Sequence, residues 1–210
     1  MGNKQLREYI EAEIMPRYES YDAAHRRDHI EGVVERSMTL AAHYEELNLD
    51  MVYTIAAYHD LGLPEGRENH HLSSGRMLAE DEVLRRWFSA EEIATMREAV
   101  EDHRASATRP PRTLYGCIVA EADRQIVPEV VIRRTVQYGL SHYPHLTQEE
   151  HWERFIGHLH EKYDYGGYLT LHIPHSDNAQ RLEELRQIIA RPEELRKRFE
   201  EEMARLVGKE

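Results

Sequence analysis

The adjacent pair His59-Asp60 is the part of this sequence best suited to chemistry. It ends an apolar run that begins at Met51. An imidazole beside a carboxylate can reach one metal ion from both side chains, and mixed nitrogen and oxygen ligands suit a divalent ion that activates water. Further residues of ligand type lie next to apolar helical patterns: His29, His71, His103 and Asp123. The sequence therefore predicts a metal-dependent hydrolase.

Length and composition indicate an ordinary globular protein. The 210 residues are enough for one well-buried domain. No apolar stretch approaches the roughly 20 residues that span a bilayer, and the N-terminus lacks the apolar segment of a signal peptide. The single cysteine, Cys117, excludes an intrachain disulfide and fits a reducing compartment. We expect a cytoplasmic protein that does not bind membranes.

The charge balance argues against one class of partner. The chain has 27 basic and 39 acidic residues, for a net charge of −12. An acidic protein is poorly suited to bind the phosphate backbone of a nucleic acid polymer. Small anionic substrates remain compatible with this charge because a bound metal dominates its local field. The sequence leaves the oligomeric state open, with a homodimer among the alternatives.

Hydrophobic periodicity predicts an almost wholly helical protein. Apolar residues recur every fourth position over 4–18, which indicates an amphipathic helix. A second helix, from 22 to about 47, carries His25 and His29 one turn apart. A third ends at the His-Asp pair, because glycine and proline follow it. Further helices are expected over 70–87, 90–104, 111–124, 128–141, 147–163, 177–190 and 192–207.

No repeat, heptad pattern or low-complexity linker divides the chain. We therefore expect one domain over 1–210, an all-α bundle of about eight to ten helices. Its catalytic core would occupy about 20–142, with the C-terminal helices of 147–207 packed on it. At most a short β-ribbon is expected, near 168–173.

Helical bundles commonly build metal sites from inward side chains on facing helices. A single histidine on an apolar helix face is more often a hydrogen-bonded core or cap residue. The set taken together favours a metal, because burying several ionisable groups without one would be costly. The expected ligands come from separate helices: His29, then His59 with Asp60, then His71, then His103, then Asp123.

These segments resemble the HD-domain phosphohydrolase superfamily, whose pattern is a histidine, an adjacent His-Asp pair and a later aspartate on consecutive helices. The matching segments are residues 28–33, 56–62 and 122–124. Residues 20–36, with Arg134 and Lys162 on later helices, are also similar to a subgroup of bacterial nucleotide phosphohydrolases. The sequence departs from that subgroup after Lys162, where Tyr-Asp-Tyr-Gly-Gly follows.

The resemblance implies that His29, His59, Asp60 and Asp123 hold one divalent metal ion. Imidazole with carboxylate suits Mn²⁺, Fe²⁺ or Ni²⁺, and suits Mg²⁺ less well. His71 and His103 fall where two-metal members carry extra histidines. They would either bind a second ion bridged by Asp60 or contact the substrate phosphate directly, so we expect one or two ions per chain.

Other residues are candidates for supporting roles. Besides Asp60, the candidates for catalysis are His25 and Glu68, which could transfer a proton. A helix-entry histidine and a solvated loop glutamate are the structural alternatives. Cationic candidates for binding the substrate phosphate are Arg124, Arg134 and Lys162, although a residue of this kind is more often a surface cation.

The function that the resemblance implies is hydrolysis of a phosphomonoester or pyrophosphate bond, with a small phosphorylated molecule as substrate and a nucleotide favoured. One alternative is a non-catalytic HD-type regulatory module that binds a nucleotide or a protein. Another is an HD-type di-iron oxygenase. A degenerate module would be expected to lose ligands, and this chain keeps them all, which favours the enzyme.

Overall fold

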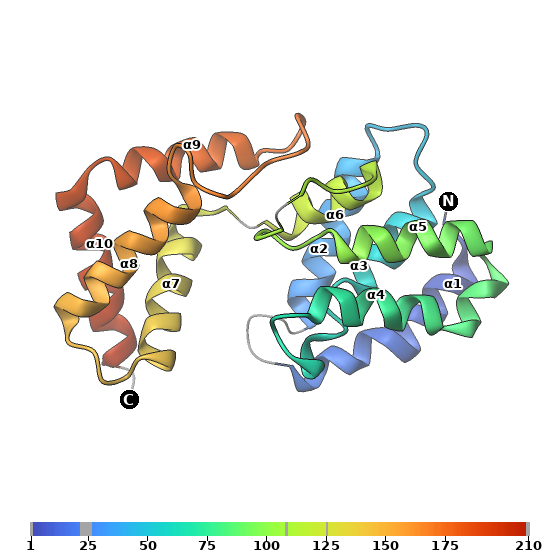
Figure 1. The fold of residues 1–210 in the computed structure, drawn as a ribbon, viewed down its shortest axis with the longest axis horizontal. Coiled ribbons are helices and arrows are strands. Elements are labelled where there is room, and N and C mark those ends of the chain that lie inside the picture. Colours follow the sequence, from blue (N-terminus) through green and yellow to red (C-terminus); the bar gives the residue numbers. More distant parts are fainter. Residues whose placement is uncertain (1, 22–26, 108, 125, 209–210) are drawn as a thin grey trace. The chain divides into compact units, whose positions relative to one another are not determined.

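The protein is all-α, as predicted. The computed structural model describes residues 2–21, 27–107, 109–124 and 126–208, and no β-strand occurs in these ranges. The described α-helices are α1 (Lys4–Tyr9), α2 (Arg27–Ala41), α3 (Leu49–Tyr58), α4 (His70–Glu80), α5 (Ala90–Glu101), α6 (Leu114–Asp123), α7 (Pro128–His142), α8 (Gln148–Tyr163), α9 (Asn178–Ile189) and α10 (Pro192–Val207) (Figure 1). Among the described helices, none is both long and apolar enough to cross a membrane.

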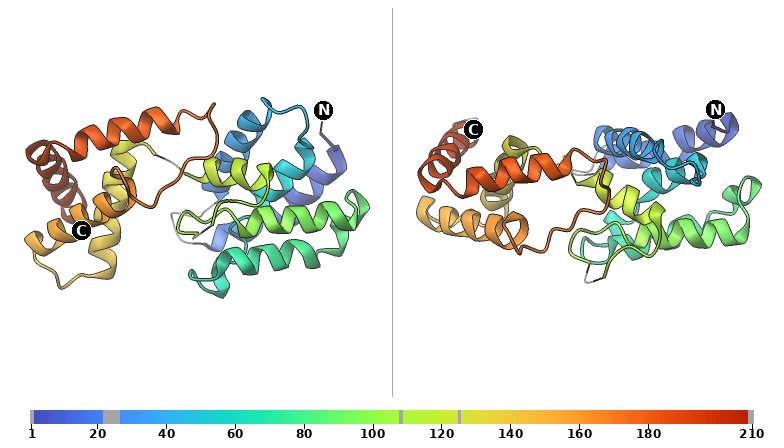
Figure 2. Two further views of the ribbon diagram at one scale, coloured as in Figure 1. Left: turned by 45° about the horizontal axis from the view of Figure 1, so that its top comes forward. Right: turned by 90° about the horizontal axis from the view of Figure 1, so that it is seen from above.

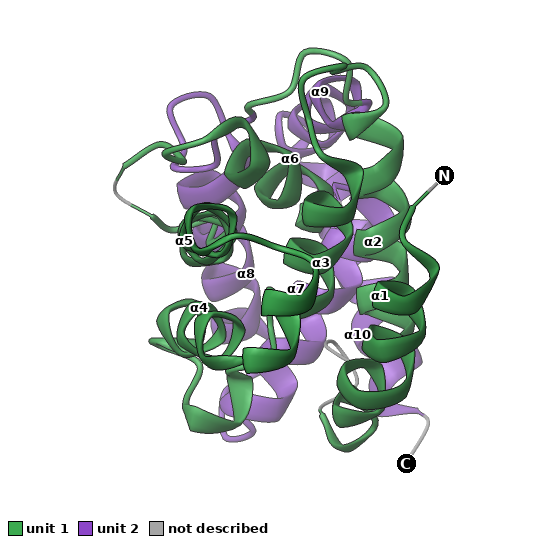
Figure 3. Ribbon diagram, turned by 90° about the vertical axis from the view of Figure 1, so that its right-hand side faces the viewer, with its two compact units in different colours: residues 1–124, 172–176 green, residues 125–171, 177–210 purple. Residues whose placement is uncertain are grey.

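The chain divides into two compact units (Figure 3), and the expectation of one domain over 1–210 stays a prediction. Unit 1 comprises Met1–Arg124 and His172–Ser176, and unit 2 comprises Gln125–Leu171 and Asp177–Glu210. Helix α7 therefore belongs with the C-terminal helices, although the predicted core extended to 142. Only a few residues separate α6 from α7, and they are neither glycine-rich nor proline-rich. Composition therefore does not mark this boundary.

Helix α3 is the buried centre of unit 1. Every residue from Met51 to Tyr58 is buried, so α3 is enclosed on all sides by other elements (Figure 3). Two tyrosines hold its C-terminal end. The hydroxyl of Tyr18 donates to the carbonyl of Ala57 at 2.8 Å, and the hydroxyl of Tyr21 donates to that of Leu61 at 2.7 Å. These bonds fix the backbone on both sides of His59-Asp60.

The N-terminal helix and the helix after the Gly/Pro loop differ from their predicted forms. The expected helix over 4–18 continues from α1 through a π-helical segment, η1 (Ile10–Ile14), and a 3-10 segment, η2 (Met15–Ser20). The expected helix over 70–87 stops at Glu80. A 3-10 segment, η4 (Glu82–Arg86), follows it, because Asp81 accepts a hydrogen bond from the N–H of Val83.

A short piece of the second half of the chain completes unit 1. We call His172–Ser176 the strap. Its Ile173 is 4% exposed and packs with Ala41, Val52 and Ile118. The N–H of His172 donates to Oε2 of Glu121 at 2.8 Å. No strand occurs among the described residues, so the ribbon considered near 168–173 does not form there.

Unit 2 is built from α7 to α10 around an apolar core. The rings of Trp152, Phe155 and Phe199 pack together, with centroids 5.1 to 5.7 Å apart. Helix α8 begins with a capping box, in which Thr147 and Glu150 satisfy each other's backbone N–H groups. In unit 1, α4 and α5 lie side by side (Figure 2). His70 begins α4, and His103 follows the end of α5.

Candidate metal centre

His59 lies at the C-terminal end of α3 and is fully buried. Its Nδ1 is 2.8 Å from the carbonyl oxygen of Ala56. A carbonyl can only accept, so Nδ1 carries the hydrogen and, in the neutral ring, Nε2 keeps its lone pair. Ligating histidines are commonly oriented in this way by a carbonyl behind the ring.

Two other histidines are oriented by the same device. Nδ1 of His70 is 2.8 Å from the carbonyl of Arg67, and Nδ1 of His103 is 2.6 Å from the carbonyl of Val100. Each carbonyl lies three residues before its histidine. The fold thus fixes three imidazoles in the tautomer that a metal requires.

The first group of potential ligands, which we call subsite A, consists of His29, His59 and Asp123. Oδ1 of Asp123 lies 3.3 Å from Nε2 of His29 and 3.8 Å from Nε2 of His59. The three residues come from α2, α3 and α6. Asp123 is the most open of them, with 28% of its side chain exposed, so solvent reaches the group at this carboxylate.

The second group, subsite B, consists of Asp60, His70 and His103. Oδ1 of Asp60 lies 3.2 Å from Nε2 of His70 and 3.4 Å from Nε2 of His103. The two Nε2 atoms are 3.1 Å apart. All three side chains are largely buried, with at most 11% exposed.

Asp60 connects the two subsites. Its Oδ1 faces subsite B, while its Oδ2 lies 3.4 Å from Nε2 of His59 and 3.8 Å from Nε2 of His29. Four imidazoles therefore surround one carboxylate. This is the arrangement in which a carboxylate can contact two ions at once.

The electrostatics follow from this crowding. Burial alone would lower the pKa of His59, but the carboxylates of Asp60 and Asp123 outweigh burial and raise it to about 9. Burial alone would raise the pKa of Asp60, yet His59 and the other imidazoles hold it well below its usual range. The pKa of Asp123 is likewise lowered, because His29 and His59 outweigh its burial. The carboxylates are thus ionised and attract positive charge.

These residues fit a divalent cation. The buried Nε2 of His59 has no hydrogen-bond partner among the described residues. In subsite B, two Nε2 atoms that both carry lone pairs in the neutral rings face each other at 3.1 Å, where they repel unless a cation lies between them. Ligand atoms held about 2.1 Å from one ion are separated by about 3 to 4 Å, as these atoms are.

The structure places His70, not His71, in subsite B. Nε2 of His70 faces Asp60, while His71 belongs to neither subsite. Neighbouring residues on a helix point about 100° apart, so the choice depends on how α4 is rotated, which local sequence does not determine. Burial, together with His103 and His70, lowers the pKa of His71 to about 4. The sequence indicates His70 only in that it lies next to His71, the predicted residue.

The candidates for proton transfer lie apart from both subsites or outside the described residues. His25 lies outside the described residues. Glu68 is exposed in the loop before α4 and belongs to neither subsite, and its backbone carbonyl accepts a hydrogen bond from Arg104. The geometry therefore gives Glu68 no contact with Asp60.

The three cationic candidates differ in their surroundings. Arg124 follows Asp123 and is 8% exposed, and its Nε and Nη1 are buried without hydrogen-bond partners among the described residues. Burial lowers the pKa of Arg124. Arg134 is exposed on α7, and the ammonium group of Lys162 lies 5.0 Å above the ring of Tyr163; both belong to unit 2.

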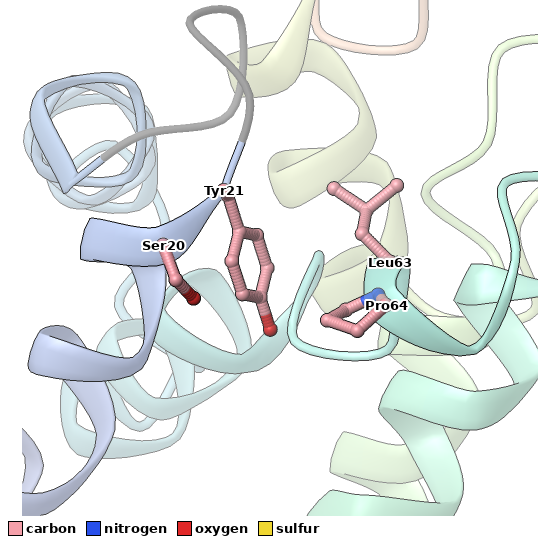
Figure 4. A pocket seen from close by; sticks show the side chains of 4 residues that line it. All are labelled: Ser20, Tyr21, Leu63 and Pro64. Atoms are coloured by element: carbon pink, nitrogen blue, oxygen red, sulfur yellow. The ribbon is translucent and has the colours of Figure 1, made fainter.

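A pocket of about 290 Å³ lies beside the turn that follows Asp60. Ser20 and Tyr21 at the end of η2 face Leu63 and Pro64 of η3 (Leu63–Glu65) (Figure 4). The hydroxyl of Tyr21 donates to the carbonyl of Leu61, one residue after Asp60. The volume is at the lower end of the range for small-molecule sites.

Comparisons with known proteins agree with this fold. Residues 26–125 match the family model described as HD domain. A crystal structure of a predicted HD superfamily hydrolase from an uncultured Thermotogales bacterium resembles the chain, with a TM-score of 0.51 and 23% identity. The match covers 72% of this chain and 83% of that one. Among curated proteins, none matches the sequence significantly.

Proposed function

Because residues 26–125 match the HD-domain family model, we propose that this chain is a metal-dependent phosphohydrolase of the HD-domain superfamily. The observation that carries the proposal is Asp60, whose two carboxylate oxygens face two separate sets of imidazoles at 3.2 to 3.8 Å. A regulatory module that had lost catalysis would not need to keep such a buried, charged arrangement, which is costly without a cation.

In this proposal, His29, His59 and Asp123 hold one ion, and His70 and His103 hold a second, with Asp60 between them. Nitrogen and oxygen ligands together favour Mn²⁺, Fe²⁺ or Ni²⁺ over Mg²⁺. A divalent ion supplies Lewis acidity toward a phosphoryl oxygen and activates water. Asp123, as the exposed edge of subsite A, is where substrate reaches the centre.

Arg124 is the cation we assign to the substrate phosphate. Its buried Nε and Nη1 groups lack partners in the described structure, and a phosphate would satisfy both through a bidentate contact. Arg134 and Lys162 remain further candidates, from unit 2. His25 and Glu68 remain candidates for proton transfer.

A nucleotide is the substrate we favour, cleaved at a phosphomonoester or pyrophosphate bond. The pocket formed by Tyr21, Leu63 and Pro64 supports an organic group larger than phosphate alone. An aromatic ring opposite a proline offers two flat apolar faces, which suit a planar base. Tyr21 is anchored one residue from Asp60, so the pocket and the metal ligands share one turn.

The central test measures bound metal by mass spectrometry and phosphate release over a panel of nucleoside mono-, di- and triphosphates. The wild-type chain should bind Mn²⁺, Fe²⁺ or Ni²⁺ and hydrolyse at least one member of the panel. Asp60→Asn should lower activity by more than about a hundredfold, because the residue between the two ions is lost. Asp177→Asn, at an exposed aspartate of unit 2, is the matched control and should leave both measurements unchanged.

A wild-type chain that binds no divalent metal and releases no phosphate would overturn the proposal. The nucleotide preference has its own test. Pro64→Ala should raise KM for the preferred nucleotide and leave KM for glycerol phosphate unchanged, because Pro64 lines the pocket and only the nucleotide extends into it. Equal changes for both substrates would remove the argument for a base-binding pocket.

A further inference from the structure

The turn after Asp60 approaches α4 at Gly62, and it does so more closely than a residue with a side chain at this position would allow. A Cβ atom added at Gly62 would lie 2.5 Å from the carbonyl oxygen of His70 and 2.6 Å from the backbone nitrogen of Ser74. Cβ atoms essentially never come that close to backbone, and backbone cannot swing aside as a flexible side chain can. Only glycine fits here without moving α4.

A buried hydrogen bond holds this approach in place. The N–H of Gly62 donates to Oγ of Ser74 at 2.8 Å, and Ser74 is fully buried. Gly62 lies two residues after Asp60, and the atom it touches belongs to His70. The contact therefore joins the backbone that carries Asp60 to the first turns of the helix that carries His70.

A second glycine holds the other side of α4. A Cβ atom at Gly75 would lie 2.8 Å from Cγ of Glu101 and 3.2 Å from the carbonyl oxygen of Arg97, both on α5. His103 follows α5 by two residues. The separation of α4 from α5 at Gly75 thus affects the 3.1 Å spacing between His70 and His103.

Subsite A has no such dependence on α4. Its three residues lie on α2, at the end of α3 and at the end of α6. A small displacement of α4 would move His70 away from Asp60 and leave the spacing of His29, His59 and Asp123 as it is. The two subsites therefore differ in which contacts build them.

We propose that Gly62, through its contact with His70 and Ser74, is the positioning residue of subsite B and sets whether a second ion binds. Gly75 assists it from the α5 side. This inference rests on the proposed function in taking the two subsites as metal sites. It goes further because it assigns the independence of the two subsites to the contact of Gly62 with the backbone of α4, and Gly62 itself would bind no ion.

The test titrates the full-length metal-free chain with Mn²⁺ and counts bound ions per chain. Wild type should bind two ions. Gly62→Ala should weaken the second site by about tenfold or more, the size expected when the support behind a metal ligand is removed, and leave the first site unchanged. Gly75→Ala should act in the same direction with a smaller effect. Gly157→Ala is the matched control, because a Cβ there meets nothing within 4 Å, and it should bind like wild type.

Two further measurements keep the test decisive. Ser74→Ala leaves the backbone unchanged and removes only the hydrogen bond to Gly62, so it serves if Gly62→Ala does not fold, and it too should weaken the second site selectively. A crystal structure of metal-free Gly62→Ala should show Oδ1 of Asp60 moved beyond contact with Nε2 of His70, whether or not metal binds.

Each outcome points to one conclusion. Wild type that binds no ion would overturn the proposed function, and the Asp60 to His70 distance in the metal-free variant would still decide the positioning claim. If folded Gly62→Ala keeps that contact and binds two ions as tightly as wild type, Gly62 is not a positioning residue. Equal weakening of both sites would also overturn the inference, because it would indicate general loss of structure.

Discussion

The two units bury different kinds of residue. Unit 1 buries a dense set of ionisable side chains, including His59, Asp60, His103 and Glu121. In the described part of unit 2, the buried polar side chains are Thr135, His151 and Asn178. Unit 2 instead keeps its charges in exposed or partly exposed pairs around an aromatic core, such as those of Arg198 with Glu194 and Glu129.

This difference indicates that unit 1 is less stable than it could be, because it buries the ionisable residues that chemistry requires. Burying ionisable groups is unfavourable unless they are paired or bind a cation, whereas an aromatic core stabilises a fold directly. Unit 1 should therefore depend on metal for part of its stability, and unit 2 should depend on packing. The predictions below test this contrast.

The largest expected effect on stability is loss of an aromatic ring from unit 2. Phe199→Ala removes a side chain 1% exposed that packs on Trp152 and Phe155, which should lower the free energy of unfolding by about 3 to 5 kcal/mol. Urea unfolding measures it. Val207→Ala, at an exposed position of the same helix, should change stability by less than about 0.5 kcal/mol. Should the two variants lose equal stability, packing would not be what holds unit 2 together.

The next effect belongs to unit 1 and comes from metal. Adding Mn²⁺ at about 100 times its Kd should raise the free energy of unfolding by about 2.7 kcal/mol for one site, and a chelator should reverse the gain. Asp60→Asn should abolish most of it, and Phe199→Ala should retain it. Thermal unfolding with and without metal measures each case. A metal-dependent gain that survives Asp60→Asn would place the ion elsewhere.

The third effect is the contribution of unit 2, through His151, to the dependence of stability on pH. Burial, and then Arg154, lowers the pKa of His151 below its ordinary value. The unfolded chain binds a proton there more readily than the folded chain, so stability falls as pH drops below about 6.5. His151→Gln should make the fall of the unfolding free energy between pH 7.5 and 5 less steep, and exposed His142→Gln should not. Identical pH profiles for both variants would contradict this assignment.

The smallest effect is expected from exposed ion pairs, in either unit. Arg76 in unit 1 pairs with Glu65, and Arg198 in unit 2 pairs with Glu129. Replacing either arginine with alanine should lower stability by less than about 1 kcal/mol, and salt should reduce the difference further. Urea unfolding at low and high salt checks it. A larger loss in one unit would show that the units differ at their surfaces as well as in their cores.

Local signals were enough to predict much of the fold. The closing helix was predicted over 192–207 and is observed over the same residues, because its proline start and apolar spacing are both local. The end of α4 at Glu80 was not predicted. Asp81 stops that helix while accepting hydrogen bonds from the hydroxyls of Tyr9 and Tyr58, and these partners are far away in sequence.

The candidate site shows the same distinction between local sequence signals and contacts with residues far away in sequence. The expected ligands lie close together in the structure: His29, His59, Asp60, His103 and Asp123. Residue type and helical context were enough to identify them. The choice between His70 and His71 depends on helix rotation, and the place of Gly62 depends on a contact between two elements. Helical periodicity carries neither kind of information.

The strap has a consequence for how this protein is made. Unit 1 would ordinarily fold as soon as its residues left the ribosome, because domains tend to fold in the order of synthesis. Here Ile173 and the N–H that binds Glu121 are translated only after α7 and α8. The nascent chain must hold an unfinished unit 1, in which Ile118 lacks its contact with Ile173, while much of unit 2 emerges. A gene cut after Arg124, where the first stretch of unit 1 ends, would leave that intermediate as its final product.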